Sequence, residues 1–240
     1  MCYRKPRMAA GVSSSFRGPV FTQLLLADEI NRTPPKTQAA LLEAMQERQV
    51  TVANRTLSLP SPFCVIASQN PIEQEGTYPL PEAQQDRFML CLMLDYPERD
   101  QEIEVLLRTT SGAPAELQAV LSLEEILGFQ GLVDRIAVSR EAATYAADLA
   151  RATRPGRPGV PAFITELVDW GAGPRAGQAL LRAAKAAAAM DGRPAIAIGD
   201  LRDMAHPVLR HRLSCNYKAR AQGLSADDII TRLLESVKAG

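Results

Sequence analysis

The sequence predicts an α/β fold in which a short parallel sheet, ending near residue 96, is followed by a part built from helices alone. Residues 24–27 and 63–67 are two short apolar runs, and each has the length and composition of a buried parallel strand. A helical pattern separates them, and strands that alternate with helices favour a parallel sheet. From Pro97 onward the apolar side chains recur at helical spacing.

Local patterns define the other elements of the α/β part. A helix should begin at Thr33 and end near Arg48, because threonine is a good N-cap and the prolines that follow suit a first turn. Residues 49–59 alternate between apolar and polar side chains, which predicts a β-hairpin with its turn at Asn54 and Arg55. The remaining elements are a short helix over 81–87 and a third strand over 89–94.

The helical part is divided by a run of proline and glycine. Residues 154–161 read RPGRPGVP, which neither a helix nor a strand tolerates, so a loop or linker is expected there. Ser122 and Glu125 form a capping-box pattern, and Ser225 stands in the position of another N-cap. The helices expected in this part lie over 102–108, after Ser122, over 139–152, around Leu180 and Ala184, and after Ser225.

Composition and charge exclude several classes of protein. The 240 residues include 27 basic and 27 acidic side chains and are 46% hydrophobic, so general disorder is excluded. A net charge of zero gives no electrostatic basis for binding nucleic acid or an anionic membrane. The longest uncharged apolar run, 88–94, is far too short to span a bilayer, and residues 1–17 lack the apolar core of a secretory signal. We therefore expect neither a nucleic-acid partner nor a membrane partner.

The cysteines and histidines do not form a zinc motif. The four cysteines lie far apart in the sequence, and His206 and His211 lack the spacing of a helical metal pair. Cys64 and Cys91 fall in apolar runs, where buried and unreactive thiols are expected. Free thiols favour a reducing compartment, so the sequence predicts a cytoplasmic location.

Asp28 and Glu29 are the first candidate site residues. They follow directly on the apolar run 24–27, and the carboxyl ends of parallel strands are where α/β folds bind ligands. In a nucleotide hydrolase the aspartate would hold Mg²⁺ and the glutamate would polarise the attacking water. Asn70 ends the next strand in the same way, and its amide can orient a water or a phosphate without adding charge. Taken alone, the acidic pair is also explained by a surface turn or a helix start, and Asn70 by an Asn-Pro turn.

Several long motifs resemble the MoxR family of AAA+ ATPases. The resemblance covers roughly residues 18 to 235. Its motifs are GPVF at 18–21, LADEINRTPPKTQ at 26–38, LLEAMQE at 41–47, ASQNPIEQEGTYPLPEAQ at 67–84, DRF at 86–88, WGAGPRA at 170–176 and PVLRHRL at 207–213.

The resemblance implies a role for each candidate residue. Asp28 and Glu29 resemble the Walker B pair, with Asp28 as the ligand of Mg²⁺ and both residues beside ATP. Asn70 resembles sensor 1. Arg87 resembles an arginine finger offered to a neighbouring subunit, and Arg175 resembles sensor 2 in the lid. Without the resemblance, either arginine would be taken as a solvated surface cation.

The resemblance also implies a division of the chain. Residues 1–17 do not look like the family and form a leader, and 18–96 form a partial AAA+ core with a parallel sheet. Residues 97–161 form a helical connector and linker, and 162–240 form a small all-helical lid domain.

One family motif is missing from the sequence. MoxR proteins carry a strand, a G-x-x-x-x-G-K-[ST] phosphate loop (P-loop) and its helix before the Walker B strand, and no segment of these 240 residues matches that loop. A truncated form is expected, with a misplaced start or a paralogue without a P-loop as alternatives. Because P-loop amides and lysine hold the phosphates, the chain by itself is expected to bind ATP weakly.

The leading functional hypothesis is a MoxR-type, ATP-hydrolysing chaperone for the assembly or maturation of partner complexes. By resemblance, the completed protein would form a homo-oligomeric ring, expected to be a hexamer, and would act with a von Willebrand factor A-domain protein and protein clients. The alternative is a partner-binding module that keeps the lid and hairpin without hydrolysing ATP. A third hypothesis, dinucleotide binding, rests on G-x-G-x-x-A at 171–176. It is disfavoured because helical spacing precedes this motif and Pro174 lacks an N–H for the pyrophosphate.

Overall fold

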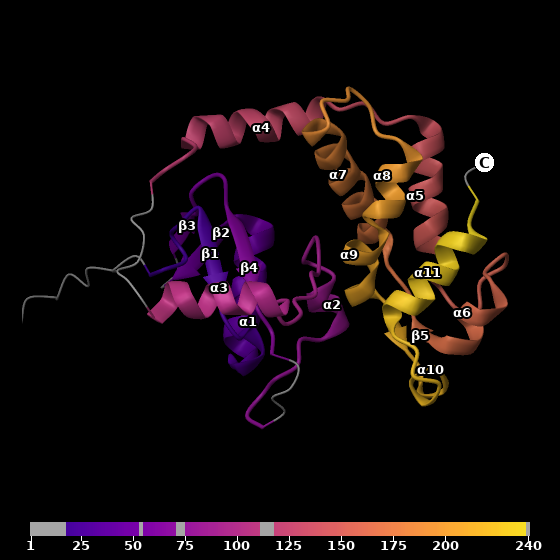
Figure 1. The fold of residues 1–240 in the computed structure, drawn as a ribbon. Helices are drawn as coiled ribbons and strands as arrows, with labels where there is room; N and C mark the ends of the chain where they lie inside the picture. Colours follow the sequence, from indigo (N-terminus) through magenta and orange to yellow (C-terminus); the bar gives the residue numbers. More distant parts are fainter. Residues whose placement is uncertain (1–17, 53–54, 71–74, 111–117, 239–240) are drawn as a thin grey trace, which may run out of the picture. The chain divides into compact units, whose positions relative to one another are not determined.

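A computed structural model describes residues 18–52, 55–70, 75–110 and 118–238. The chain divides into two compact units, the first ending at Pro79 and the second beginning at Leu80 (Figure 1). The described part of the first unit contains a parallel strand pair, and the second is mostly helical, which confirms the predicted fold class.

The first unit is built on a parallel pair of strands. β1 (Leu24–Ala27) lies beside β4 (Cys64–Ala67) in register, with Ala27 opposite Ala67. β2 (Gln49–Val52) and β3 (Arg55–Ser58) form the predicted antiparallel hairpin. Of the two residues expected in its turn, Asn54 lies outside the described residues, and the prediction was wrong for Arg55, which begins β3 and pairs with Val52.

The helix between the two strands begins later than predicted. α1 (Pro35–Glu47) has Pro34 as its N-cap residue, and no side chain caps it. Thr33 instead closes the short 3₁₀ turn η1 (Ile30–Arg32), where its N–H donates to the Ile30 carbonyl at 3.1 Å. The prediction of Thr33 as N-cap was wrong because Pro34 itself precedes a proline and is held in extended geometry, with ψ 146°, so the first helical residue is Pro35.

The parallel strands are covered on one face in the described structure. Leu25 and Val65 pack against the small core around Phe63. On the other face, Leu24 and Leu26 are 60% and 64% exposed. The expectation of fully buried strands was therefore wrong for this face, and Cys64, which alternates with Val65, is exposed rather than buried.

The second unit contains the predicted helices together with two very short strands (Figure 1). Its elements are α2 (Glu82–Gln85), α3 (Arg99–Thr110), α4 (Leu123–Arg135), α5 (Arg140–Ala152), α6 (Ala162–Leu167), β5 (Val168–Trp170), α7 (Pro174–Met190), α8 (Ile198–Asp203), α9 (Ala205–Leu209), the 3₁₀ turn η2 (Arg210–Arg212), β6 (Ser214–Cys215), α10 (Tyr217–Ala221) and α11 (Ala226–Ser236). No helix in the described ranges is both long and apolar enough to cross a bilayer.

Helix α7 lies at the centre of this unit. α4, α5, α8 and α9 all contact it, and its inner face supplies the fully buried Leu180. The Ser122 and Glu125 capping box is present, with Glu125 N–H donating to Ser122 Oγ at 3.2 Å and Ser122 N–H donating to Glu125 Oε2 at 2.7 Å. Ser225 caps α11 in the same manner, so both predicted caps are confirmed.

The third strand predicted over 89–94 does not form. Residues 90–97 have no regular structure. Cys91 donates its N–H to the Pro207 carbonyl at 2.8 Å, and Arg210 Nη1 donates to the Cys91 carbonyl at 3.0 Å. The segment's backbone groups thus find partners at the end of α9 and in η2, and the apolar pattern alone could not reveal this.

The turn between β5 and α7 depends on a glycine. The sequence predicted helical structure through Val168, but this residue starts β5, which pairs antiparallel with β6. Gly171 then passes so close to Thr153 that an added Cβ would lie 2.2 Å from the Thr153 carbonyl oxygen. Ala172 N–H donates to Thr153 Oγ1 at 2.8 Å and fixes this approach. Gly171 therefore has a packing role in this fold.

We expect Gly171→Ala to destabilise the second unit by about 2 kcal/mol or more, because the atoms in contact are backbone atoms that cannot move aside. Gly177→Ala is the matched control: its Cβ would meet Ala146 O at 3.8 Å, an ordinary contact. Alanine is the better helix former, so this control should be stabilised by about 0.5–1 kcal/mol. Urea denaturation measures both, and equal midpoints for the two variants would contradict the packing role.

Candidate functional site

The parallel register brings Asp28 and Ser68 together at the carboxyl end of the strand pair. Each residue directly follows its strand, β1 or β4. Ser68 Oγ donates to Asp28 Oδ1 at 2.5 Å and accepts the Glu29 N–H at 2.8 Å. One hydroxyl therefore fixes the position of both acidic residues, and Ser68 is a site residue that the sequence did not single out.

Glu29 has an unusual backbone conformation. Its φ and ψ are 47° and 53°, in the left-handed region that residues other than glycine seldom adopt. Such strain costs about 1–3 kcal/mol and persists where surrounding contacts enforce it. Here Ile30 N–H donates to the Ser68 carbonyl at 3.0 Å, while the Glu29 carboxylate pairs with Arg32 at 3.2 Å. The backbone thus sets the direction in which the Glu29 side chain leaves the strand end.

The residues after Glu29 are supported by a buried glutamine on α1. Gln38 is 1% exposed, and its Nε2 donates to the Ile30 carbonyl at 3.1 Å and to the Tyr78 carbonyl at 2.9 Å. Tyr78 N–H donates in turn to the Asn31 carbonyl at 2.5 Å. The loop that carries the acidic pair is therefore held from α1 as well as from β4.

Asn70 lies at the same end of the strand pair. Its carbonyl accepts a hydrogen bond from Asn31 Nδ2 at 3.4 Å. The other amide atom, Asn31 Oδ1, is buried and has no partner within the described part of the chain. Asp28, Glu29 and Asn70 are therefore brought to one edge of the first unit, as the sequence predicted from the strand ends.

The edge of the first unit that carries Asp28 is suited to Mg²⁺, and it is less suited to a metal ion whose ligands all come from the protein. Among the described residues, no group of three or more histidine, cysteine, aspartate or glutamate side chains could hold a metal ion. Mg²⁺ usually takes one or two carboxylates and completes its shell with water and phosphate oxygens. Asp28 is exposed and has one oxygen bonded to Ser68, so the second oxygen remains suited to this role.

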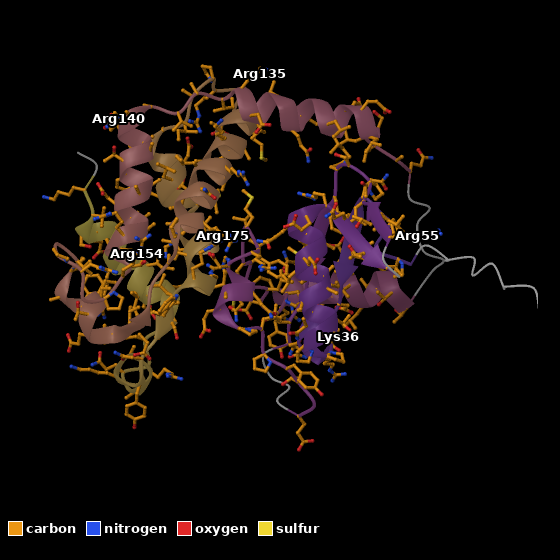
Figure 2. All side chains as sticks on the ribbon, turned by 180° about the vertical axis from the view of Figure 1, so that it is seen from behind. Lys36, Arg55, Arg135, Arg140, Arg154 and Arg175 are labelled. Atoms are coloured by element: carbon orange, nitrogen blue, oxygen red, sulfur yellow. The ribbon has the colours of Figure 1, made fainter. Side chains whose placement is uncertain are left out.

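The two candidate arginines belong to the second unit, as does Asp86, which directly precedes Arg87 in the sequence and pairs with Arg175. Arg87 is in the turn after α2, and its Nε is buried without a hydrogen-bond partner in the ranges described. Arg175 is in the first turn of α7 (Figure 2). Its side chain is 52% exposed, and its Nη1 pairs with Asp86 Oδ2 at 3.3 Å.

A third arginine, which the sequence analysis did not select, holds the other oxygen of Asp86. Arg212 Nε donates to Asp86 Oδ1 at 2.8 Å, and the Arg212 side chain is 2% exposed. Burial lowers the pKa of Arg212, and the hydrogen bond and charge of Asp86 counteract this effect. Removing one partner of such a buried pair typically costs about 3–5 kcal/mol, because the other charge is left uncompensated.

His211 completes the contacts around this turn. Its pKa is lowered to about 4, first by burial and then by the charge of Arg212. The ring is therefore neutral at neutral pH, and since a carbonyl only accepts, Nε2 carries the proton that is donated to the Phe88 carbonyl at 3.1 Å.

Two parts of the chain match described protein families. Residues 8–90 match the ATPase family associated with various cellular activities (AAA), and residues 162–233 match the AAA lid domain. The first match begins upstream of Gly18, so it includes part of the segment 1–17 that the sequence analysis set apart as a leader.

Named relatives cover most of the chain. Chaperone MoxR1 of Mycobacterium tuberculosis is 41% identical over 221 residues, which are 92% of this chain and 58% of that protein. The uncharacterized protein YeaC of Bacillus subtilis is 39% identical, over 92% of this chain and 67% of its own length. Protein MoxR of Paracoccus denitrificans is 32% identical, over 86% of this chain and 66% of its own length.

The fold has a counterpart among solved structures. The crystal structure of a protein from Cytophaga hutchinsonii, described as an ATPase, has a TM-score of 0.87 and 40% sequence identity. The similarity covers 94% of this chain and 68% of that one. The chain thus spans about six-tenths to two-thirds of its relatives' lengths. From the matched core and lid and from these relatives, we conclude that the chain belongs to the MoxR family of AAA+ ATPases.

Proposed function

We propose that this chain carries the hydrolytic side chains of a MoxR-type ATPase that hydrolyses ATP between the subunits of a ring. The observation that carries the proposal is the strand-end network in which Ser68 fixes Asp28 and the strained Glu29. To position a metal ion and a water, a site needs carboxylates that are held in place, and here they are held at the end of a parallel strand. A surface turn would not need a left-handed glutamate held by a second strand.

The proposed roles in the first unit divide the chemistry among three side chains. Asp28 would hold Mg²⁺, which when bound neutralises charge on the phosphate oxygens. Glu29 would accept hydrogen bonds from the attacking water and so polarise it. The Asn70 amide would orient that water or the terminal phosphate without adding charge.

The arginines of the second unit would act on two different nucleotides. Arg87 would reach the terminal phosphate bound by a neighbouring subunit, where a guanidinium stabilises charge in the transition state. Arg175 would act as sensor 2 on the nucleotide of its own subunit. Its half-exposed side chain is free enough to exchange Asp86 for a phosphate.

The biological setting of the proposal is supported by the name of one relative and by the family resemblance of the sequence. MoxR1 is named a chaperone, and we propose the same role here, in a cytoplasmic hexamer with a von Willebrand factor A-domain partner and protein clients. The domain limits proposed from the sequence, with a core over 18–96 and a lid over 162–240, remain part of this proposal. A partner-binding module without hydrolysis is the second candidate, since the hairpin β2–β3 has Val52 54% exposed at its tip.

Nucleotide binding and turnover separate these candidates. The experiment uses residues 1–240 and a second protein, called the P-loop form, in which the Walker A strand, P-loop and helix of a MoxR relative precede Gly18. We expect the P-loop form to hydrolyse Mg-ATP and residues 1–240 to show no tight binding, because P-loop amides and lysine supply most of the phosphate contacts. Calorimetric titration and phosphate release measure the two quantities.

Two results would count against the proposal. A P-loop form that assembles and binds Mg-ATP without turning it over would favour the partner-binding module. A micromolar dissociation constant at one site on residues 1–240 would mean that other residues hold the phosphates.

A further inference from the structure

The turn that carries Arg87 is bound along its backbone by three consecutive side chains of η2. Arg212 donates to the carbonyls of Asp86 and Phe88, at 3.1 and 2.7 Å, and to that of Met89 at 3.2 Å. His211 Nε2 donates to the Phe88 carbonyl, and Arg210 Nη1 donates to that of Cys91. The acceptors lie within 86–91, so the short turn η2 of the lid region binds the backbone of this whole segment.

The contacts of Arg212 enclose Arg87 in the sequence. Asp86 and Phe88 are its immediate neighbours, and the carbonyls of both bind the same guanidinium. A guanidinium is planar and has five donors in a fixed arrangement, so several simultaneous acceptors determine the geometry of the bound chain. Arg212 also donates to the Val208 carbonyl within its own turn, and its side chain is 2% exposed.

Asp86 connects the contacts of Arg212 to Arg175. Its Oδ1 is bound by the buried Arg212 and its Oδ2 by Arg175, which is 52% exposed. If Arg175 moves to another anion, Asp86 keeps a charged partner and does not become an uncompensated carboxylate. The pair Asp86–Arg212 is thus a fixed anchor, and Arg175 is its movable ligand.

We propose that Arg212 is a positioning residue for ATP hydrolysis, which fixes the turn of Arg87 and, through Asp86, the resting place of Arg175. The inference rests on the proposed function, in which these two arginines serve the nucleotides of two adjacent subunits. One buried guanidinium would then set the relative position of both groups. A change of Arg175 at its own nucleotide would act directly on Asp86, which is the residue next to Arg87.

The first arm of the test measures the turn itself in residues 1–240. Arg212→Lys keeps the charge and removes the planar set of donors. If this variant does not fold, Asp86→Asn replaces it, because that substitution leaves every backbone acceptor of the segment in place. We expect amide hydrogen exchange over 86–91 to rise about tenfold or more in either variant. The matched control is Arg193→Lys, which alters another two-bond pair of this unit, with Asp200 at 2.9 and 2.6 Å. Exchange over 86–91 should be unchanged in this control.

The second arm measures hydrolysis in the P-loop form. A misplacement of about 1 Å can lower turnover about 100-fold, so Arg212→Lys and Asp86→Asn should lower kcat strongly and leave KM within about twofold. If Arg212 only stabilised the fold, Arg212→Lys and the Arg193→Lys control would lower the fraction of active protein to the same extent.

Each outcome decides a separate claim. Unchanged exchange over 86–91 overturns the inference, and so does raised exchange with a wild-type kcat. If the unsubstituted P-loop form binds Mg-ATP without hydrolysing it, the proposed function fails, and the exchange measurement still decides whether Arg212 orders the turn.

Discussion

Glu29→Gln in the P-loop form is expected to bind Mg-ATP like the unsubstituted protein and to hydrolyse it about 100-fold more slowly or worse. Glutamine has the same shape as glutamate, so the substitution should not change the strain of the left-handed backbone at φ 47°. It cannot, however, polarise water as a carboxylate does. Calorimetry gives the dissociation constant, and phosphate release gives kcat.

The control for this substitution is Glu43→Gln, which removes one exposed carboxylate from α1 in the same unit. It should leave both constants unchanged. Turnover by Glu29→Gln within a few-fold of the unsubstituted protein would show that Glu29 does not activate the water. A parallel loss of nucleotide affinity would instead show that Glu29 contributes to binding.

Arg87→Ala is expected to lower kcat about 1,000-fold or more, the range typical of arginine fingers. The buried Arg87 Nε has no hydrogen-bond partner among the described residues, so its removal breaks no hydrogen bond recorded there. Nucleotide affinity at the subunit's own site should therefore be kept. Arg99→Ala is the control, since that arginine is exposed on α3. A weakened dissociation constant with an unchanged kcat would exclude the finger role.

Much of the fold could be predicted because its determinants are local. The Ser122 and Ser225 caps, the loop over 154–161 and the presence of the hairpin each depend on residues close in sequence. The two parallel strands were predicted because each apolar run is short and is separated from the other by a helical pattern.

The errors arose where distant groups decide the structure. Residues 89–94 have the composition of a strand, but side chains of η2 and the Pro207 carbonyl of α9 bind their backbone. The exposure of Leu24 and Cys64 depends on what covers a sheet face, which the strand's own sequence does not encode.

The candidate site was predictable in its main residues and not in their supports. Asp28, Glu29 and Asn70 are found from strand ends and motifs, whereas Ser68 becomes visible only once β1 and β4 are in register. Arg212 lies 126 positions from its partner Asp86, and no local pattern links them. The adjacency of Asp86 to Arg87 was the one sequence signal that could have drawn attention to this pair.

Mixed rings test the central claim, hydrolysis between subunits, most directly. Subunits with Arg87→Ala keep Glu29, and subunits with Glu29→Gln keep Arg87, so one of the two mixed interfaces has both groups intact. We predict that mixing the two inactive P-loop forms restores ATP hydrolysis above the level of either form alone. If subunit exchange is confirmed and phosphate release stays at the level of the separate variants, Arg87 does not act on a neighbour's nucleotide, and the account is contradicted.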